Sequence, residues 1–236
     1  LLWCIGLAPL IVVVSMLQMS KSNIPSFEQL ENPPDLQASV IFSEDGKEMG
    51  RFWKVNRSSV EYNEISPYVI NALIATEDER YLEHSGVDFR AVARALKGMG
   101  KDGGASTISQ QLAKLLYSNR SKSKWERLEQ KFGENVLATR LEKSYSKEEI
   151  ITMYLNNFDF LYNAVGIGTA SKVYFNKEAK DLNQQEAAML IGMCKNPGRY
   201  NPLSYQIKKY SDDPVKQAEK RAKDSTRAYN SRNTVL

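Results

Sequence analysis

Apolar and polar residues follow one another along this chain in two different rhythms. Between residues 38 and 55 the apolar residues fall in short runs on either side of Asp45-Gly46, which predicts a small β-hairpin. From Ile65 onward they recur every three or four positions, as on one face of an amphipathic helix. The stretches that fit this spacing best are 68–83, 88–98, 107–117, 125–143, 147–156 and 183–194. The pattern predicts an all-α fold with one minor β-hairpin.

The first twenty residues carry no charged side chain. Twenty residues of helix extend about 30 Å, the thickness of a bilayer's hydrocarbon core. We therefore expect a transmembrane anchor over residues 1–20. A signal peptide is the competing interpretation, and no small-residue cleavage pattern before Lys21 supports it. The rest of the chain divides into a juxtamembrane linker with the hairpin (21–64), a helical domain (65–204) and a charged C-terminal helix or linker (205–236).

Composition and charge argue against several classes of protein. The net charge of +4 is too small to indicate nucleic-acid binding by itself. Two cysteines far apart in the sequence, Cys4 and Cys194, argue against a disulfide framework. His84 is the single histidine, which argues against a Cys/His metal site.

The first candidate for chemistry is an acidic stretch, "ATEDERYLEHSG", at residues 75–86. On a helix, Glu77 falls where a core residue is expected, whereas Glu79 and Glu83 point elsewhere. The other residues on its face are Ile70, Leu73, Ile74, Tyr81 and His84. A carboxylate on an inner face is either paired within the protein or lines a cleft and serves as a general acid or base. Spacing alone leaves both interpretations open.

A second candidate is a glycine-rich segment, residues 98–114. It leads into an amphipathic helix, at whose start Thr107 and Gln110 have the spacing of a capping box. The expected apolar stripe of this helix is Ile108, Leu112, Leu115 and Leu116. Glycines before a helix N-terminus present free N–H groups and the positive end of the helix dipole, which suit a phosphate group. The alternative is an ordinary surface loop with a routine helix cap.

A further carboxylate, Glu134, shares a predicted helix face with Leu137, Ala138 and Leu141, and Lys131 lies one turn before it. This pattern also fits an ordinary charged helix with i,i+4 ion pairs.

Together these segments resemble glycosyltransferase family 51, the peptidoglycan polymerases. The family's first motif, Glu-Asp-x-x-Phe-x-x-His-x-Gly, matches residues 77–86 with Tyr81 in place of Phe. Its second, Gly-x-Ser-Thr-Ile-Thr-Gln-Gln, matches residues 104–111 with Ser109 in place of the second Thr. Its third, Arg-Lys-x-x-Glu, matches residues 130–134 with Gln130 in place of Arg. Residues 145–177 and 182–202 resemble the fourth and fifth motifs with their neighbours.

The resemblance implies a lysozyme-like, two-lobed glycosyltransferase that polymerises lipid II into β-1,4 glycan chains, with inversion and release of undecaprenyl pyrophosphate. It implies Glu77 as the general base and Glu134 as a second essential carboxylate. The implied substrate-binding residues are Asp78, Arg80, Arg94, Ser106, Thr107, Gln110, Gln111, Lys114, Arg120 and Lys131. A divalent cation, Mg²⁺ or Mn²⁺, stays open as a cofactor, and no metal ligand is assigned.

The implied partners are lipid II, the growing glycan strand and the bilayer, with other cell-wall synthesis proteins as further candidates and no nucleic acid. The implied location is the bacterial plasma (inner) membrane, with the catalytic domain on its periplasmic or extracytoplasmic face. Apolar residues within 89–99 form either a core stripe or a helix face that dips into the membrane interface. The C-terminal ten residues resemble the segment that leads towards the transpeptidase in bifunctional class A penicillin-binding proteins. We therefore expect a transpeptidase domain after residue 236.

Two alternatives from other classes stay open. A lysozyme-like enzyme that cleaves glycans would share the helical fold and a catalytic glutamate, but would need neither the anchor nor a cationic pyrophosphate site. A non-catalytic, membrane-bound cell-wall scaffold would need neither Glu77 nor Lys114.

Overall fold

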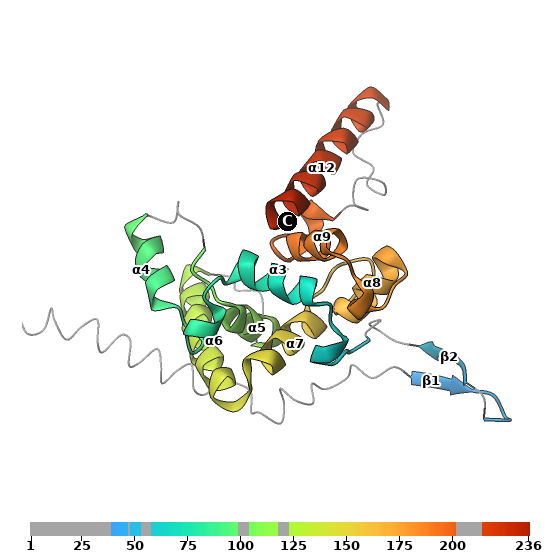
Figure 1. Ribbon diagram of the computed structural model, residues 1–236, viewed down its shortest axis with the longest axis horizontal. Coiled ribbons are helices and arrows are strands. Elements are labelled where there is room, and N and C mark those ends of the chain that lie inside the picture. Colours follow the sequence, from blue (N-terminus) through green and yellow to red (C-terminus); the bar gives the residue numbers. More distant parts are fainter. Residues whose placement is uncertain (1–38, 47, 53–57, 99–103, 118–122, 202–213) are drawn as a thin grey trace, which may run out of the picture. The chain divides into compact units, whose positions relative to one another are not determined.

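The computed structural model describes residues 39–46, 48–52, 58–98, 104–117, 123–201 and 214–236 (Figure 1). The chain divides into two compact units, and it crosses between them after Glu79 and after Ile150. Of the described residues, the first unit contains 80–150, and the second contains 39–79 and 151–236. Helices and one two-stranded sheet make up the regular structure of these residues, which confirms the predicted all-α class with a hairpin.

The first unit is built on two packed helices, α5 (Ile108–Tyr117) and α6 (Lys124–Ser144). Their facing sides bury Ile108, Leu112, Leu137 and Leu141. Within each helix these residues are four apart, so the apolar period of the sequence places them on one face. The unit also contains α4 (Phe89–Lys97) and the first turn of α7 (Lys147–Asn157).

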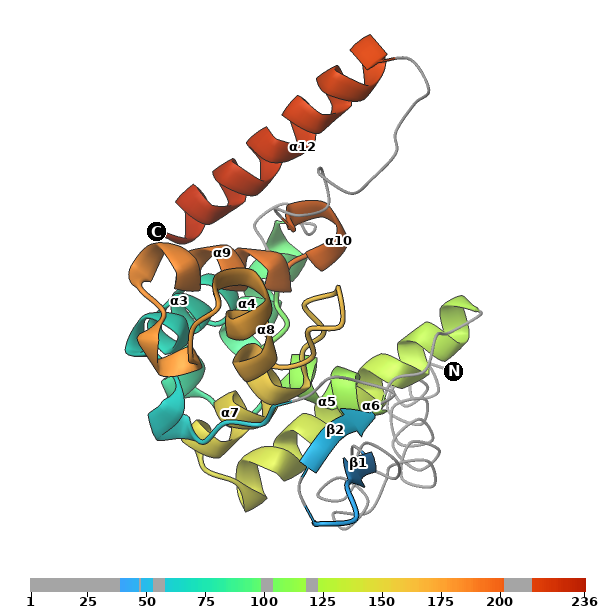
Figure 2. The ribbon, with the colours of Figure 1, turned by 90° about the vertical axis from the view of Figure 1, so that its right-hand side faces the viewer.

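The second unit is built around α9 (Gln184–Cys194), which packs against α3 (Pro67–Glu77) and α12 (Pro214–Val235) (Figure 2). From Ala187 to its last residue α9 is mostly buried, as expected for a helix that is apolar all round. The close approach of α12 requires a small residue at Gly192, because a Cβ atom there would lie 2.9 Å from the Ser231 hydroxyl oxygen. The rest of α7, α8 (Ile167–Phe175) and α10 (Pro197–Tyr200) complete the helices described in this unit.

The predicted hairpin is present in the second unit. Strand β1 (Ser39–Phe42) pairs antiparallel with β2 (Glu48–Phe52), with a register irregularity between Ile41 and Phe42. Gly46 in the connecting turn has a φ of +77°, a conformation that glycine adopts without strain.

The expected helix over 68–83 is wrong beyond Glu77. Asp78, with φ −160° and ψ 71°, lies outside the helical region, and a short 3₁₀ helix follows at Tyr81–Glu83. Tertiary contacts of the first unit override the helical period here. Arg80 is bonded to Asp88, and the buried Tyr81 donates its hydroxyl proton to the Lys147 carbonyl (3.0 Å).

The other helices that the sequence analysis delimits begin and end within one residue of their expected bounds. Two observations differ from expectation. Leu115, expected in the apolar stripe of α5, is 41% exposed. Helix α8 was not foreseen, because four of the five buried residues in its first half are small and show no apolar period: Gly168, Thr169, Ala170 and Ser171. The expected charged C-terminal helix corresponds to α12.

No helix in the described part of the chain is long and apolar enough to cross a bilayer. The predicted anchor, residues 1–20, and the linker residues 21–38 lie outside that part. Of the apolar residues expected on one face of α4, Phe89 is 78% exposed and Val92 is half-buried.

Candidate active site

The glycine-rich segment enters α5 through the capping box that its sequence predicts. The Thr107 N–H donates to Oε1 of Gln110 (3.0 Å), and the Gln110 N–H donates to Oγ1 of Thr107 (3.2 Å). The Thr107 hydroxyl also donates to the Gly86 carbonyl (2.6 Å), which ties this segment to the first motif. The Gln110 amide donates to Oδ1 of Asn135 on α6 (2.8 Å). Both capping side chains are buried, so they position the segment that precedes the helix.

The last residue of the first motif, Gly86, packs closely against the backbone of α6. Gly86 has a φ of +93°, and a Cβ atom at this position would lie 2.9 Å from the Ala138 carbonyl. Both the conformation and the close approach to the helix backbone require glycine. The Gly86 backbone therefore packs directly against the α6 backbone at Ala138, one turn after Glu134.

One lysine connects the glycine-rich segment to the carboxylate of α6. The Lys131 ammonium donates to Oε2 of Glu134 (2.8 Å) and to the Ser106 hydroxyl oxygen (3.2 Å). Glu134 is 3% exposed, whereas the Lys131 side chain is 46% exposed. A buried carboxylate therefore orients a cation whose outer side faces solvent. This ammonium lies next to the residue that precedes the N-cap of α5.

Arg80 is held by an acid that sequence analysis did not single out. Its guanidinium contacts both carboxylate oxygens of Asp88, one of them at 2.6 Å. Asp88 also accepts from the N–H groups of Arg90 and Ala91, both at 3.0 Å, at the start of α4. Burial by itself raises the pKa of Asp88, but the Ala91 N–H and the Arg80 guanidinium outweigh it, so the pKa lies below its usual value. The segment from Arg80 to Arg90 surrounds a pocket of about 400 Å³.

A partly buried ion pair at the junction of α6 and α7 contacts the first motif at Tyr81 and His84. The Lys147 ammonium donates to Glu142 (2.9 Å) and to the His84 carbonyl (2.6 Å), and it lies 4.2 Å from the centre of the Tyr81 ring. The Ser109 hydroxyl of α5 donates to the same Glu142 carboxylate. The sequence gives no signal for this pair, because the two residues lie on different helices five positions apart.

Glu77 and Asp78 lie in the second unit, at the C-terminal end of α3. Glu77 is half-buried and Asp78 is buried. Burial raises the pKa of Tyr154 on α7 and of Cys194 at the end of α9, and the charge of Glu77 raises both further. Tyr154 and Cys194 are therefore neutral at pH 7, with an O–H and an S–H group near the Glu77 carboxylate.

Comparison with known families decides the assignment. The sequence profile of the family described as "Transglycosylase" matches residues 45–227, most of the chain and parts of both units. The chain belongs to this transglycosylase family. The family and the enzyme class that the motifs predicted, a peptidoglycan glycosyltransferase domain, are thereby confirmed.

Two similar proteins are penicillin-binding proteins. This chain is 36% identical over 203 residues to penicillin-binding protein 1A of Neisseria gonorrhoeae. The matched region covers 84% of this chain and 24% of that protein. It is 39% identical over 175 residues to penicillin-binding protein 1F of Bacillus subtilis (strain 168), which covers 72% of this chain and 24% of the relative. The chain thus spans about a quarter of the length of the curated relatives it matches.

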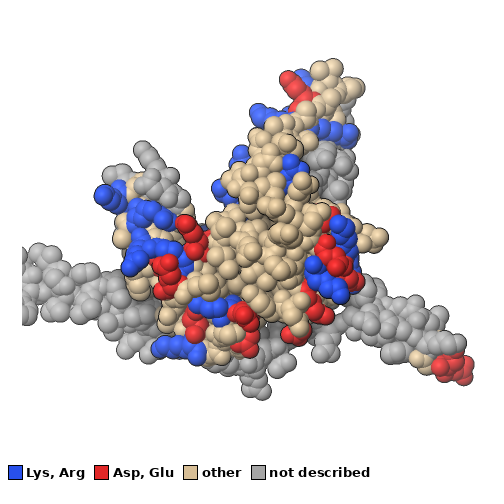
Figure 3. All heavy atoms as spheres, in the orientation of Figure 1, with Lys and Arg blue, Asp and Glu red and all other residues tan. Residues whose placement is uncertain are grey.

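The first unit of the transglycosylase brings together most of the predicted site residues. It contains Arg80, Arg94, Ser106, Thr107, Gln110, Gln111, Lys114, Lys131 and Glu134. Gln111 and Lys114 are three residues apart on α5, half-buried and exposed respectively. Arg94 is exposed on α4, over which basic side chains gather (Figure 3). Arg120 lies outside the described residues.

Within the described ranges, no three His, Cys, Asp or Glu side chains come close enough together to hold a metal ion. Glu134 forms an ion pair with the Lys131 ammonium, at 2.8 Å.

Proposed function

We propose that this chain polymerises lipid II into β-1,4 glycan chains by inverting transfer, with undecaprenyl pyrophosphate as the leaving group. The observation that carries the proposal is the Lys131 ammonium, held between Glu134 and Ser106 where the glycine-rich segment meets α5.

This arrangement suits a pyrophosphate leaving group. As the glycosidic C–O bond breaks, negative charge develops on a phosphate oxygen, and a fixed cation stabilises it without reorganising. Lys131 is half exposed, so it keeps a donor for the phosphate while Glu134 and Ser106 fix its position. Lys114 and Arg94, both exposed in the same unit, are proposed as further phosphate contacts.

Glu134 is proposed to act through Lys131. A buried carboxylate that accepts a hydrogen bond from a lysine limits the rotamers of that lysine, so the cation is preorganised before substrate binds. Thr107 and Gln110 are proposed to position the loop, because their side chains are buried and bonded within the protein.

Glu77 is proposed as the base that takes the proton from the 4-hydroxyl group of the acceptor sugar. The raised pKa values of the neighbouring Tyr154 phenol and Cys194 thiol keep both groups protonated, so neither competes with Glu77 for the proton of the acceptor. The half-buried position of Glu77 keeps the carboxylate partly desolvated, which favours proton transfer.

The setting of the reaction is also a proposal. A lipid-linked substrate requires a site at the membrane surface, which the uncharged residues 1–20 would provide as an anchor. We propose a plasma-membrane location with the enzyme on the extracytoplasmic face. We also propose that the full-length protein is a penicillin-binding protein, the name that the similar proteins carry. That it is bifunctional is proposed from the resemblance of its C-terminal ten residues to the segment that leads towards a transpeptidase.

The test is polymerisation of purified lipid II by the purified protein. We expect long glycan chains that lysozyme digests, with β-1,4 linkages and release of undecaprenyl pyrophosphate. Shortening of preformed glycan without chain growth would assign a glycan-cleaving enzyme instead, and no activity on either substrate would favour a scaffold.

A further inference from the structure

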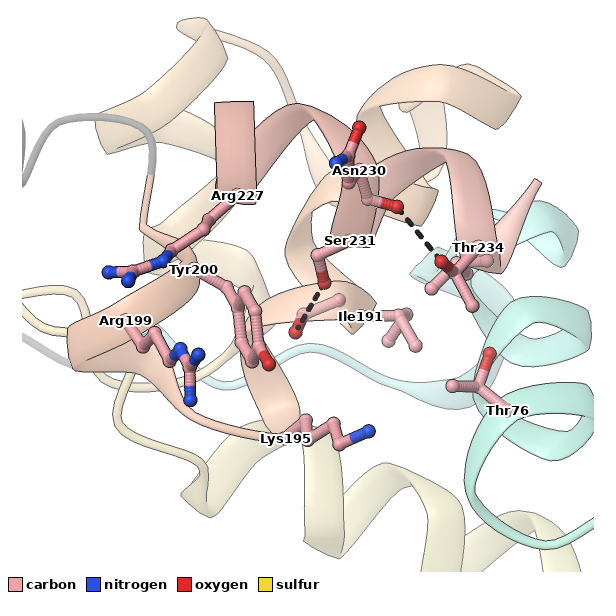
Figure 4. Close-up of a pocket in the computed structure, with 11 residues that line it drawn as sticks. Thr76, Ile191, Lys195, Arg199, Tyr200, Arg227, Asn230, Ser231 and Thr234 are labelled. Atoms are coloured by element: carbon pink, nitrogen blue, oxygen red, sulfur yellow. Dashed lines mark hydrogen bonds between the residues drawn. The ribbon is translucent and has the colours of Figure 1, made fainter. Parts of the chain in front are cut away.

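A second cationic site lies wholly within the second unit, whereas the glycine-rich segment belongs to the first. It is a pocket of about 270 Å³ enclosed by α3, α9, α10 and α12 (Figure 4). Ile191 and Gly192 of α9 contribute an apolar side, and the Tyr200 ring contributes another surface. On α12, the Ser231 hydroxyl donates to the Gly192 carbonyl (3.3 Å), which fixes this helix against α9.

The charge of this pocket is uneven. Three cations line it, Lys195, Arg199 and Arg227, and no carboxylate is among its described lining residues. Arg227 is paired with Asp224 (2.9 Å), which lies outside the lining, whereas Lys195 and Arg199 form no ion pair within the described part of the chain. The Arg199 guanidinium lies 5.7 Å from the centre of the Tyr200 ring. Two cations that have no carboxylate partner among the described residues, beside an aromatic ring, favour a carboxylate or phosphate ligand that carries some apolar surface.

The pocket lies at the end of the helix that carries the proposed base. Thr76, which lines it, directly precedes Glu77, and Lys195 directly follows Cys194. The pKa of the Cys194 thiol, which burial raises, is raised further by the charge of Glu77, so the C-terminal ends of α3 and α9 lie close together. A ligand in the pocket would therefore lie near the residue proposed to activate the acceptor sugar.

We propose that this pocket binds a carboxylate of the acidic peptide carried by the substrate's sugar. This inference rests on the proposed function, because its substrate, lipid II, is a lipid-linked disaccharide whose sugar carries a short acidic peptide. The pyrophosphate is already matched in the first unit by Lys131, with Ser106 beside it. The pocket instead offers separate cations around an apolar and aromatic surface, which suits the end of a peptide better than a compact diphosphate. By holding the peptide, the site selects sugars that bear it and orients them for Glu77.

The test compares two lipid-linked disaccharide substrates, one with free peptide carboxylates and one with the carboxylates amidated. The variants are Lys195→Gln and Arg199→Gln, alone and together. The wild-type protein should prefer the free-carboxylate substrate, with the difference in KM. Each single variant should reduce this preference about tenfold, because one charge-assisted hydrogen bond is lost. Lys180→Gln, which removes an exposed cation of the same unit outside the pocket, should retain the preference.

Three results would overturn the inference: no wild-type preference between the two substrates, an unchanged preference in the double variant, or an equal loss on both substrates. The last would assign the pocket to the phosphate groups that both substrates share.

The experiment separates this inference from the function on which it rests. An inactive wild-type protein would contradict the proposed function alone. Equilibrium binding of fluorescent forms of the two substrates then gives the same comparison without turnover, and equal affinities would still overturn the inference. Circular dichroism of the variants excludes unfolding as the cause of a change.

Discussion

At the scale of single residues, charge and burial separate the polar residues of the motifs by the contacts that they make. Arg80 is committed to Asp88, and Thr107 to Gly86 and the cap of α5. Lys131, by contrast, is held by Glu134 and Ser106 yet remains half exposed. A cation that is both fixed and accessible is the arrangement expected for a substrate contact.

The first prediction concerns Glu77. Replacing it by glutamine keeps volume and hydrogen bonding but removes the site that takes a proton. We expect Glu77→Gln to lower the rate of polymerisation by about 10²- to 10⁴-fold, the usual contribution of a general base. The measurement is the initial rate with purified lipid II.

Glu79→Gln is the matched control, since Glu79 is exposed and only two positions away. It should keep the wild-type rate. A Glu77→Gln protein that polymerises at a near-normal rate would remove Glu77 from the mechanism.

The second prediction concerns Lys131. Lys131→Gln removes a charge-assisted hydrogen bond of about 1.5–3 kcal/mol and leaves Glu134 without its ammonium partner. We expect kcat to fall by at least about tenfold. Inhibition by added pyrophosphate should weaken in parallel.

Lys143→Gln, on an exposed part of the same helix, tests for a general effect of charge. If Lys131→Gln lowers thermal stability while kcat and inhibition by pyrophosphate stay unchanged, the lysine is structural only.

At the scale of elements, the connection between α7 and α8 contains an unusual turn. Leu161, Tyr162 and Asn163 have φ values of 66°, 51° and 62°, in the left-handed region that only glycine enters without strain. Asn163 tolerates this conformation better than the two larger residues do. The turn is closed by the Ala164 N–H, which donates to the Leu161 carbonyl (3.0 Å). The Leu161 N–H in turn donates to Oδ1 of Asp159 (2.8 Å).

The third prediction follows from this turn. In ordinary backbone, alanine is favoured over glycine because glycine loses more entropy on folding. At position 161 the order should reverse, because glycine relieves the left-handed strain and alanine does not. We expect Leu161→Gly to be more stable than Leu161→Ala by about 1 kcal/mol. Urea unfolding measures the difference, and an alanine variant as stable as the glycine variant would show that the turn is unstrained.

At the scale of the whole molecule, the chain forms two compact units whose sequence segments interleave. The second unit takes residues from both sides of the first, so it cannot be completed before the first unit has been synthesised. The proposed base lies in one unit and the proposed phosphate contacts lie in the other. The proposed reaction therefore uses residues from both units.

The fourth prediction concerns the attachment of the molecule to a membrane. An arginine in the middle of a membrane-spanning helix costs about 2.5–3.5 kcal/mol. We expect Val12→Arg to lower the fraction of the protein that floats with lipid vesicles. Ser15→Ala, a neutral change in the same segment, should float as the wild type does. Equal flotation of the two variants would argue against an anchor over residues 1–20.

The sequence by itself determined the helical class, the hairpin and the ends of most helices, because apolar period, turn glycines and capping pairs are local signals. Thr107 with Gln110 is the clearest case, since four neighbouring residues contain the whole capping box. The motifs also identify the family without tertiary information. Spacing within one helix placed Glu134 among apolar residues but left open whether it is buried or part of an ordinary charged helix, and in the structure it is buried and paired with Lys131.

Only the tertiary structure decided which charges meet. The apolar spacing over 68–83 predicted a helix that continues through Asp78. In the structure the helix ends at Glu77, because Arg80 and Tyr81 make contacts within the first unit. The pair of Glu142 and Lys147 and the cationic pocket beneath α12 join residues from separate helices, so no spacing in the sequence reports them. Local pattern encodes what one helix buries, whereas the partner of a buried charge is chosen by the packing of several helices, which is a property of the folded chain alone.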